Sequence, residues 1–145
     1  MTASGADARL TGQCLCGEVR YEIQGRISPI FLCHCSKCRR VTGSAFHATA
    51  LCRPAQFRWI AGEEGIRSFE ESPDYVAHFC GRCGSPVPYL HETTQQIALH
   101  VGGLDGDPGR RVSHHIFVDS KAPWFEITDG LPQHAAHKPR KPAAS

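Results

Sequence analysis

Apolar and polar residues alternate in short runs along most of the chain, which is the pattern of half-buried β-strands. In the clearest run, residues 17–23, Val19, Tyr21 and Ile23 fall on one face and polar residues on the other. Similar runs, punctuated by Gly, Pro or Asp, occur at residues 28–32, 44–52, 57–62, 67–72, 75–80, 96–104 and 114–120. We find no stretch with helical apolar spacing. We therefore expect a mainly β fold.

The chain length of 145 residues fits a single domain. We expect a flexible leader over residues 1–10, a folded domain over residues 11–134 and a disordered basic tail over residues 135–145. The first residues lack the apolar core of a secretory signal, and no apolar run approaches the roughly 20 residues that span a bilayer. The expected location is therefore the cytoplasm, with no membrane partner.

Basic residues are concentrated near the C-terminus. The net charge is +2, but Lys138, Arg140 and Lys141 belong to the expected tail. Without these three, the 16 basic residues become 13 against 14 acidic ones, which leaves a charge of −1 on the body. A phosphate-binding face needs a larger basic excess, so this distribution argues against nucleic acid as a partner.

Seven of the eight cysteines fall into three tight groups. The groups are Cys14 and Cys16 in CLCG, Cys33, Cys35 and Cys38 in CHCSKC, and Cys80 and Cys83 in CGRCG. A reducing cytoplasm and the strain of a ring with one intervening residue both argue against disulfides. Cys52 stands apart, and we interpret it as a small buried hydrophobic residue.

Two of these groups together have the ligand number of a structural zinc. Zinc takes four ligands at tetrahedral corners, and short cysteine pairs in Gly-containing turns are typical donors. We expect Cys14 and Cys16 to meet Cys80 and Cys83 at one such ion. Because the two pairs are far apart in the sequence, the free energy of metal binding would add to the free energy of folding.

The third group has the ligand number of a catalytic zinc, whose fourth position stays open for water or substrate. We expect Cys33, Cys35 and Cys38 to bind such an ion. His34 sits between two of them and is expected to project away from the metal. His47 or another histidine could close the site and make it structural, and the sequence leaves this alternative open.

Four segments of the chain, in this order, resemble the glutathione-dependent formaldehyde-activating enzyme family, whose domain also occurs in centromere protein V. They are CLCGEVRYEI, CHCSKCRRVTGSAF, FCGRCGSPV and HIFVDSKAPWFEITDGLP, and the resemblance covers about residues 12–133. It implies a single zinc-containing β-tent domain built of small antiparallel sheets. It also implies that the four-cysteine site is structural and the three-cysteine site catalytic, the division that ligand counting predicts.

The activity implied by the resemblance is the addition of glutathione to formaldehyde, which is classed as a carbon–sulfur lyase reaction. The expected partners are therefore a small thiol and a small aldehyde. A zinc ion with an open position suits this chemistry, because it can polarise an aldehyde oxygen or stabilise a thiolate. Arg39 could bind a substrate carboxylate, and we favour it over Arg40 for this role. Ser44 could line the pocket beside the metal.

Two other functions are open from the sequence alone. The chain could be a zinc-stapled module that binds protein or nucleic acid without catalysis, in which case both zinc sites would be structural. It could instead be a redox or metal-buffer protein in which the three-cysteine group reacts directly. Whether the three-cysteine site keeps an open coordination position, is closed by a fourth side chain or reacts directly distinguishes an enzyme from these two alternatives.

Overall fold

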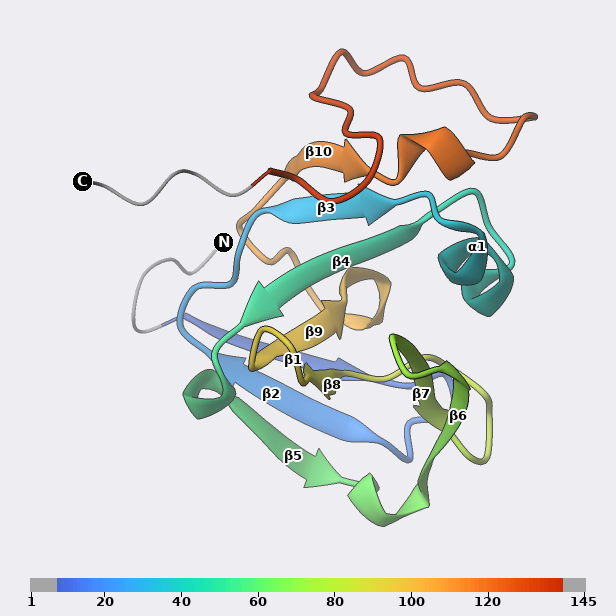
Figure 1. The fold of residues 1–145 in the computed structure, drawn as a ribbon. Coiled ribbons are helices and arrows are strands. Elements are labelled where there is room, and N and C mark those ends of the chain that lie inside the picture. Colours follow the sequence, from blue (N-terminus) through green and yellow to red (C-terminus); the bar gives the residue numbers. More distant parts are fainter. Residues whose placement is uncertain (1–7, 140–145) are drawn as a thin grey trace.

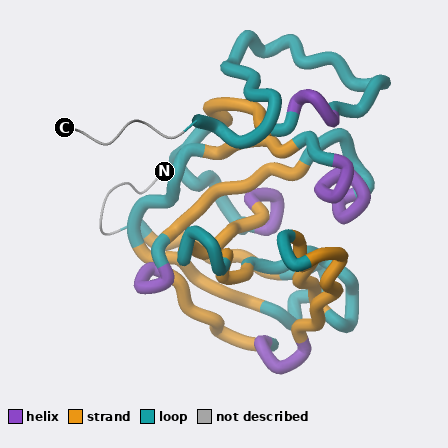
Figure 2. Tube along the Cα trace, in the orientation of Figure 1, coloured by secondary structure: helices purple, strands orange, loops and turns teal. Residues whose placement is uncertain are grey.

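The computed structural model describes residues 8–139, which form a mainly β structure with a single short α-helix (Figures 1 and 2). Within this range, no helix is long and apolar enough to cross a membrane. The strands are β1 (Arg9–Gln13), β2 (Arg20–Gln24), β3 (Ile30–Cys33), β4 (His47–Cys52), β5 (Phe57–Ala61), β6 (Ile66–Ser72), β7 (Tyr75–Cys80), β8 (Tyr89–His91), β9 (Gln96–His100) and β10 (Val112–Ile116), and the helix is α1 (Ser36–Thr42).

The strands form three small sheets, which confirms the mainly β class. The largest sheet has the strand order β10-β3-β4-β9-β8, the second has the order β1-β2-β5, and β6 and β7 form a separate hairpin. All pairs are antiparallel except β10 with β3, which differs from the expectation of antiparallel sheets. The long connection after β9 carries the chain to the far edge of the sheet, where a parallel approach becomes possible.

The main hydrophobic core joins the two larger sheets. Its buried side chains come from β2, from β3, β4 and β9, and from the loop before β3: Tyr21, Ile23, Ile27, Ile30, Leu32, Ala50, Cys52, Ile97 and Leu99. The alternation predicted around β2 is confirmed, since Val19, Tyr21 and Ile23 are all buried. Cys52 is only 3% exposed and belongs to this core, as expected for a free hydrophobic cysteine.

The ends of the folded region differ from the expected boundaries. Strand β1 begins at Arg9, so the last two residues of the predicted leader are part of the sheet. Residues 1–7 lie outside the described range, as do residues 140–145 of the predicted tail. The described start of that tail contacts the body, because the Phe117 N–H donates a hydrogen bond to the Ala136 carbonyl (3.0 Å).

Helix α1 is not predicted by the sequence pattern, and its caps explain why it forms. The Cys35 sulfur accepts a hydrogen bond from the Cys38 N–H (3.2 Å) at the N-terminus. Gly43 ends the helix in the left-handed conformation, with φ of 65°. None of the seven helical residues is fully buried, so the apolar stripe that reveals a helix is missing. The helix places Cys38 beside the end of β3.

Candidate metal centres

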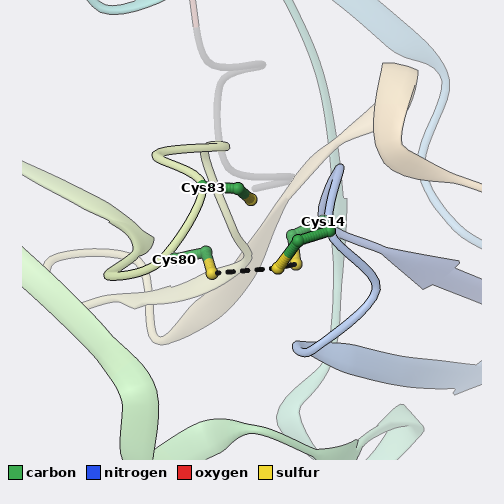
Figure 3. A group of neighbouring side chains, drawn as sticks. Cys14, Cys80 and Cys83 are labelled. Atoms are coloured by element: carbon green, nitrogen blue, oxygen red, sulfur yellow. Dashed lines mark hydrogen bonds between the residues drawn. The ribbon is translucent and has the colours of Figure 1, made fainter.

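Four cysteines from two distant segments come together. Figure 3 labels three of them, Cys14, Cys80 and Cys83, whose side chains point toward one another. Cys14 and Cys16 follow β1, whereas Cys80 ends β7 and Cys83 lies in the turn after it. All four Sγ atoms lie within 4.8 Å of one another. Cys16 Sγ is 3.5 Å from Cys14 Sγ and 3.8 Å from Cys80 Sγ. Tetrahedral Zn–S bonds of about 2.3 Å place sulfurs about 3.8 Å apart, so this group fits zinc.

Hydrogen-bond donors surround these sulfurs. The Val19 N–H donates to Cys14 Sγ over 3.3 Å. The hydroxyl and the backbone N–H of Ser85 lower the pKa of Cys83 to about 5. Thiolates, and not thiols, bind zinc, so donors of this kind favour the form that the metal requires.

The turns that carry the two cysteine pairs depend on glycine. Gly17 and Gly84 both have φ of 80°, a conformation that other residues rarely adopt. Val19 and Val87 are buried and pack with the two buried cysteines of the group in a small separate core. The four-cysteine group therefore links the β1–β2 segment to the end of the β6–β7 hairpin.

The second cysteine group combines the end of a strand with the start of the helix. Cys33 is the last residue of β3, Cys35 caps α1, and Cys38 lies in its first turn. The three Sγ atoms lie within 4.8 Å of one another. No disulfide joins any of the eight cysteines, all of which lie in the described range. The group fits three corners of a zinc tetrahedron.

No fourth metal-binding side chain from residues 8–139 joins these three sulfurs. His47 lies opposite Cys33 in the register of β3 and β4. However, one of its ring nitrogens bonds to Thr49 Oγ1 (2.6 Å) and the other to His100 Nδ1. The described side chains therefore saturate one candidate zinc site with four sulfurs and supply three to the other.

His34, between two of these cysteines, faces the protein interior. It is fully buried, and its Nε2 lies 2.8 Å from Nδ1 of His115. Nε2 of His115 donates a hydrogen bond to the Asp129 carboxylate (2.8 Å), because an ionised carboxylate can only accept. The Leu131 N–H and His115 hold the pKa of Asp129 below its ordinary value. This series of hydrogen bonds anchors the cysteine segment to the C-terminal loop and keeps the His34 side chain outside the sulfur group.

Tyr75, which the sequence pattern does not single out, lies against the three-cysteine group and is itself contacted by Lys37. The Tyr75 hydroxyl donates to Cys38 Sγ over 3.6 Å, and burial raises the pKa of Tyr75, so the donor keeps its proton. Nζ of Lys37 lies 5.7 Å from the centre of the Tyr75 ring and forms an ion pair with Glu71 (2.7 Å). These contacts hold the β6–β7 hairpin against α1. Tyr75 carries no sequence signal, because its role depends on where the hairpin folds.

The residues predicted to contact substrate lie close to the three-cysteine group in the chain. Arg39 is half-buried, and its Nε has no hydrogen-bond partner among the described residues. Ser44 is exposed just beyond the end of α1. Arg40, and not Arg39, lines a groove between α1 and the hairpin. The roles of Arg39 and Ser44 stay predictions.

A small mainly β fold with one four-cysteine and one three-cysteine group defines a protein with two candidate thiolate metal centres of different ligand number. The family model of glutathione-dependent formaldehyde-activating enzymes matches residues 9–120, and the chain belongs to this family. A crystal structure of a Rhodobacter sphaeroides protein is similar, with a TM-score of 0.54 and 24% sequence identity, over 71% of this chain and 99% of that one. This second likeness supports the fold.

Proposed function

We propose that the protein forms or breaks the adduct between a thiol, such as glutathione, and a small aldehyde, such as formaldehyde. The observation that carries the proposal is the convergence of Cys33, Cys35 and Cys38 without a fourth ligand side chain from residues 8–139. Membership of the family supports glutathione and formaldehyde as the reactants. In this proposal the three-cysteine group holds a catalytic zinc and the four-cysteine group a structural one.

The proposed reaction is an addition in which atoms and electrons balance. The thiol sulfur forms a bond to the aldehyde carbon, the carbonyl double bond becomes a single bond, and the thiol proton ends on the oxygen. The reverse reaction breaks the same carbon–sulfur bond, as in a carbon–sulfur lyase. Zinc, when bound, would supply an open coordination position that stabilises a thiolate or polarises the aldehyde oxygen. Three thiolate ligands would donate charge to the bound ion, which would favour capture of the thiol over polarisation of the aldehyde.

The chain's own groups would prepare this position in several ways. The Cys38 N–H and the Tyr75 hydroxyl donate hydrogen bonds to sulfurs of the group, which offsets the negative charge that three thiolates concentrate. Arg39 and Ser44 would contact the substrate beside the metal. Free thiolates persist in a reducing compartment, so a cytoplasmic location forms part of the same proposal.

The alternative of a zinc-stapled binding module without catalysis requires a closed second site. Such a site needs a fourth side chain, and none from residues 8–139 joins the three sulfurs. The main observation of the structure therefore favours the enzyme over the binding module.

The proposal is tested by measuring how fast glutathione and formaldehyde combine. Exchange spectroscopy with ¹³C-labelled formaldehyde gives the rate against the uncatalysed background, which is appreciable for these reagents. We expect the zinc-loaded protein to add a rate proportional to its concentration. Removal of the more weakly held zinc by a chelator should abolish this added rate, and restored zinc should return it. A rate equal to background in protein that holds two zinc ions would contradict the proposal.

A further inference from the structure

A groove lies between α1 and the β6–β7 hairpin, beside the three-cysteine group. Its volume is about 360 Å³, which is within the range of small-molecule sites. The helix contributes Lys37, Arg40 and Val41 to its walls, and the hairpin contributes Phe69, Glu71 and Tyr75. Figure 1 shows the hairpin on the same side of the molecule as α1.

The groove shares a wall with the three sulfurs. Tyr75 lines the groove, and its hydroxyl reaches Cys38 Sγ at 3.6 Å. Ser36 and Lys37, which also line the groove, occupy the two positions between Cys35 and Cys38. A molecule that reacts at the sulfur group can therefore extend its unreactive part into this groove.

The charged side chains in the groove differ in whether they are already paired. Lys37 forms an ion pair with Glu71 (2.7 Å) and a hydrogen bond with Ser72 Oγ (3.3 Å). Arg40 forms no ion pair with any residue in the range 8–139. The groove thus offers one uncommitted guanidinium, which is the side chain best suited to a carboxylate.

Two apolar side chains, Val41 from the helix and Phe69 from the hairpin, also line the groove. Val41 is 36% exposed and Phe69 is 64% exposed, so both present carbon surface at the groove to a bound molecule. A ligand that combines a carbon chain with a carboxylate matches this combination of surfaces.

We propose that this groove binds the unreactive part of the thiol substrate, with a substrate carboxylate on Arg40 and its carbon chain against Val41 and Phe69. The inference rests on the proposed function and adds to it the groove and the residue that would recognise a carboxylate remote from the sulfur. Arg40 is then the residue that selects thiols with such a carboxylate over neutral ones.

The test compares glutathione with its diethyl ester, in which both carboxylates are masked and the thiol is unchanged. With the zinc-loaded protein, Arg40→Gln should raise KM for glutathione about 10-fold at low ionic strength and leave KM for the diester unchanged. Calorimetric titration with each thiol alone should show the same change in Kd without turnover. Arg26→Gln is the matched control, because Arg26 is exposed, has no ion pair among the described residues and lies outside the groove.

The possible outcomes distinguish this inference from the proposed function. If Arg40→Gln weakens the binding of glutathione and of its diester equally, or weakens the binding of neither, the groove does not bind the carboxylate and the inference is wrong. That result would leave turnover by the wild-type protein intact. Absence of turnover with both thiols in the wild-type protein would instead overturn the proposed function. The calorimetric Kd values would still show whether Arg40 contributes to binding of the carboxylate.

Discussion

Replacing Cys80 with serine is expected to remove zinc from the four-cysteine group and to destabilise the whole domain. Cys80 is 1% exposed, and its sulfur lies 3.8 Å from that of Cys16. In small zinc-binding peptides a structural zinc contributes about 10–16 kcal/mol to folding, whereas the net stability of a domain is about 5–15 kcal/mol. Loss of even a third of this contribution lowers Tm by roughly 15 °C in a chain of this size. Thermal unfolding followed by circular dichroism measures the shift.

The matched control for Cys80→Ser is Cys52→Ala. Cys52 is also buried, at 3% exposure, but it belongs to the main core and to neither cysteine group. Its truncation should cost only about 1 kcal/mol and should leave the zinc content unchanged. Equal losses of stability in the two variants would show that the four-cysteine group contributes only ordinary packing.

Replacing Cys35 with serine is expected to abolish activity while the fold is retained. Serine is a preferred helix N-cap, so its hydroxyl can take over the hydrogen bond that the Cys35 sulfur accepts from the Cys38 N–H. The variant loses one of three zinc ligands, so its zinc content should fall from two ions to one. Changes around a metal site typically cost 10–100-fold in activity, and loss of a direct ligand should cost at least about 100-fold.

Rates of adduct formation and zinc content, measured on the same preparation of Cys35→Ser, check this prediction. Cys52→Ala again serves as the control, with two zinc ions and the wild-type rate expected. A Cys35→Ser protein that is folded and still as active as the wild type would remove the three-cysteine group from the mechanism.

The division of the cysteines could be predicted from the sequence, because ligand number and spacing are local properties. Each cysteine pair supplies only two of the four ligands that a structural zinc needs. The structure brings the two pairs, Cys14 with Cys16 and Cys80 with Cys83, together so that their sulfurs lie within 4.8 Å of one another. The alternation that predicts β2 is similarly local and is confirmed by the burial of Tyr21. In these places a few neighbouring residues contain the whole signal.

Other features could not be predicted, because they depend on tertiary contacts or on caps. Helix α1 is defined by the Cys35 sulfur and by Gly43 and has no buried face, so periodicity could not reveal it. Strand β1 lacks apolar alternation and is held by its pairing with β2. Tyr75 reaches Cys38 across a gap of 37 positions in the sequence, and only the folding of the hairpin brings the two together.

The central claim is that side chains saturate one metal ion and leave a coordination position open on the other. Replacing the zinc with cobalt(II) tests this claim most directly, because the absorption of cobalt reports the number of its sulfur ligands. We predict two cobalt ions per chain, one with four sulfur ligands and one with three, and added glutathione should convert only the second to a four-sulfur spectrum. A single cobalt ion per chain, or two whose spectra do not respond to the thiol, would contradict the account.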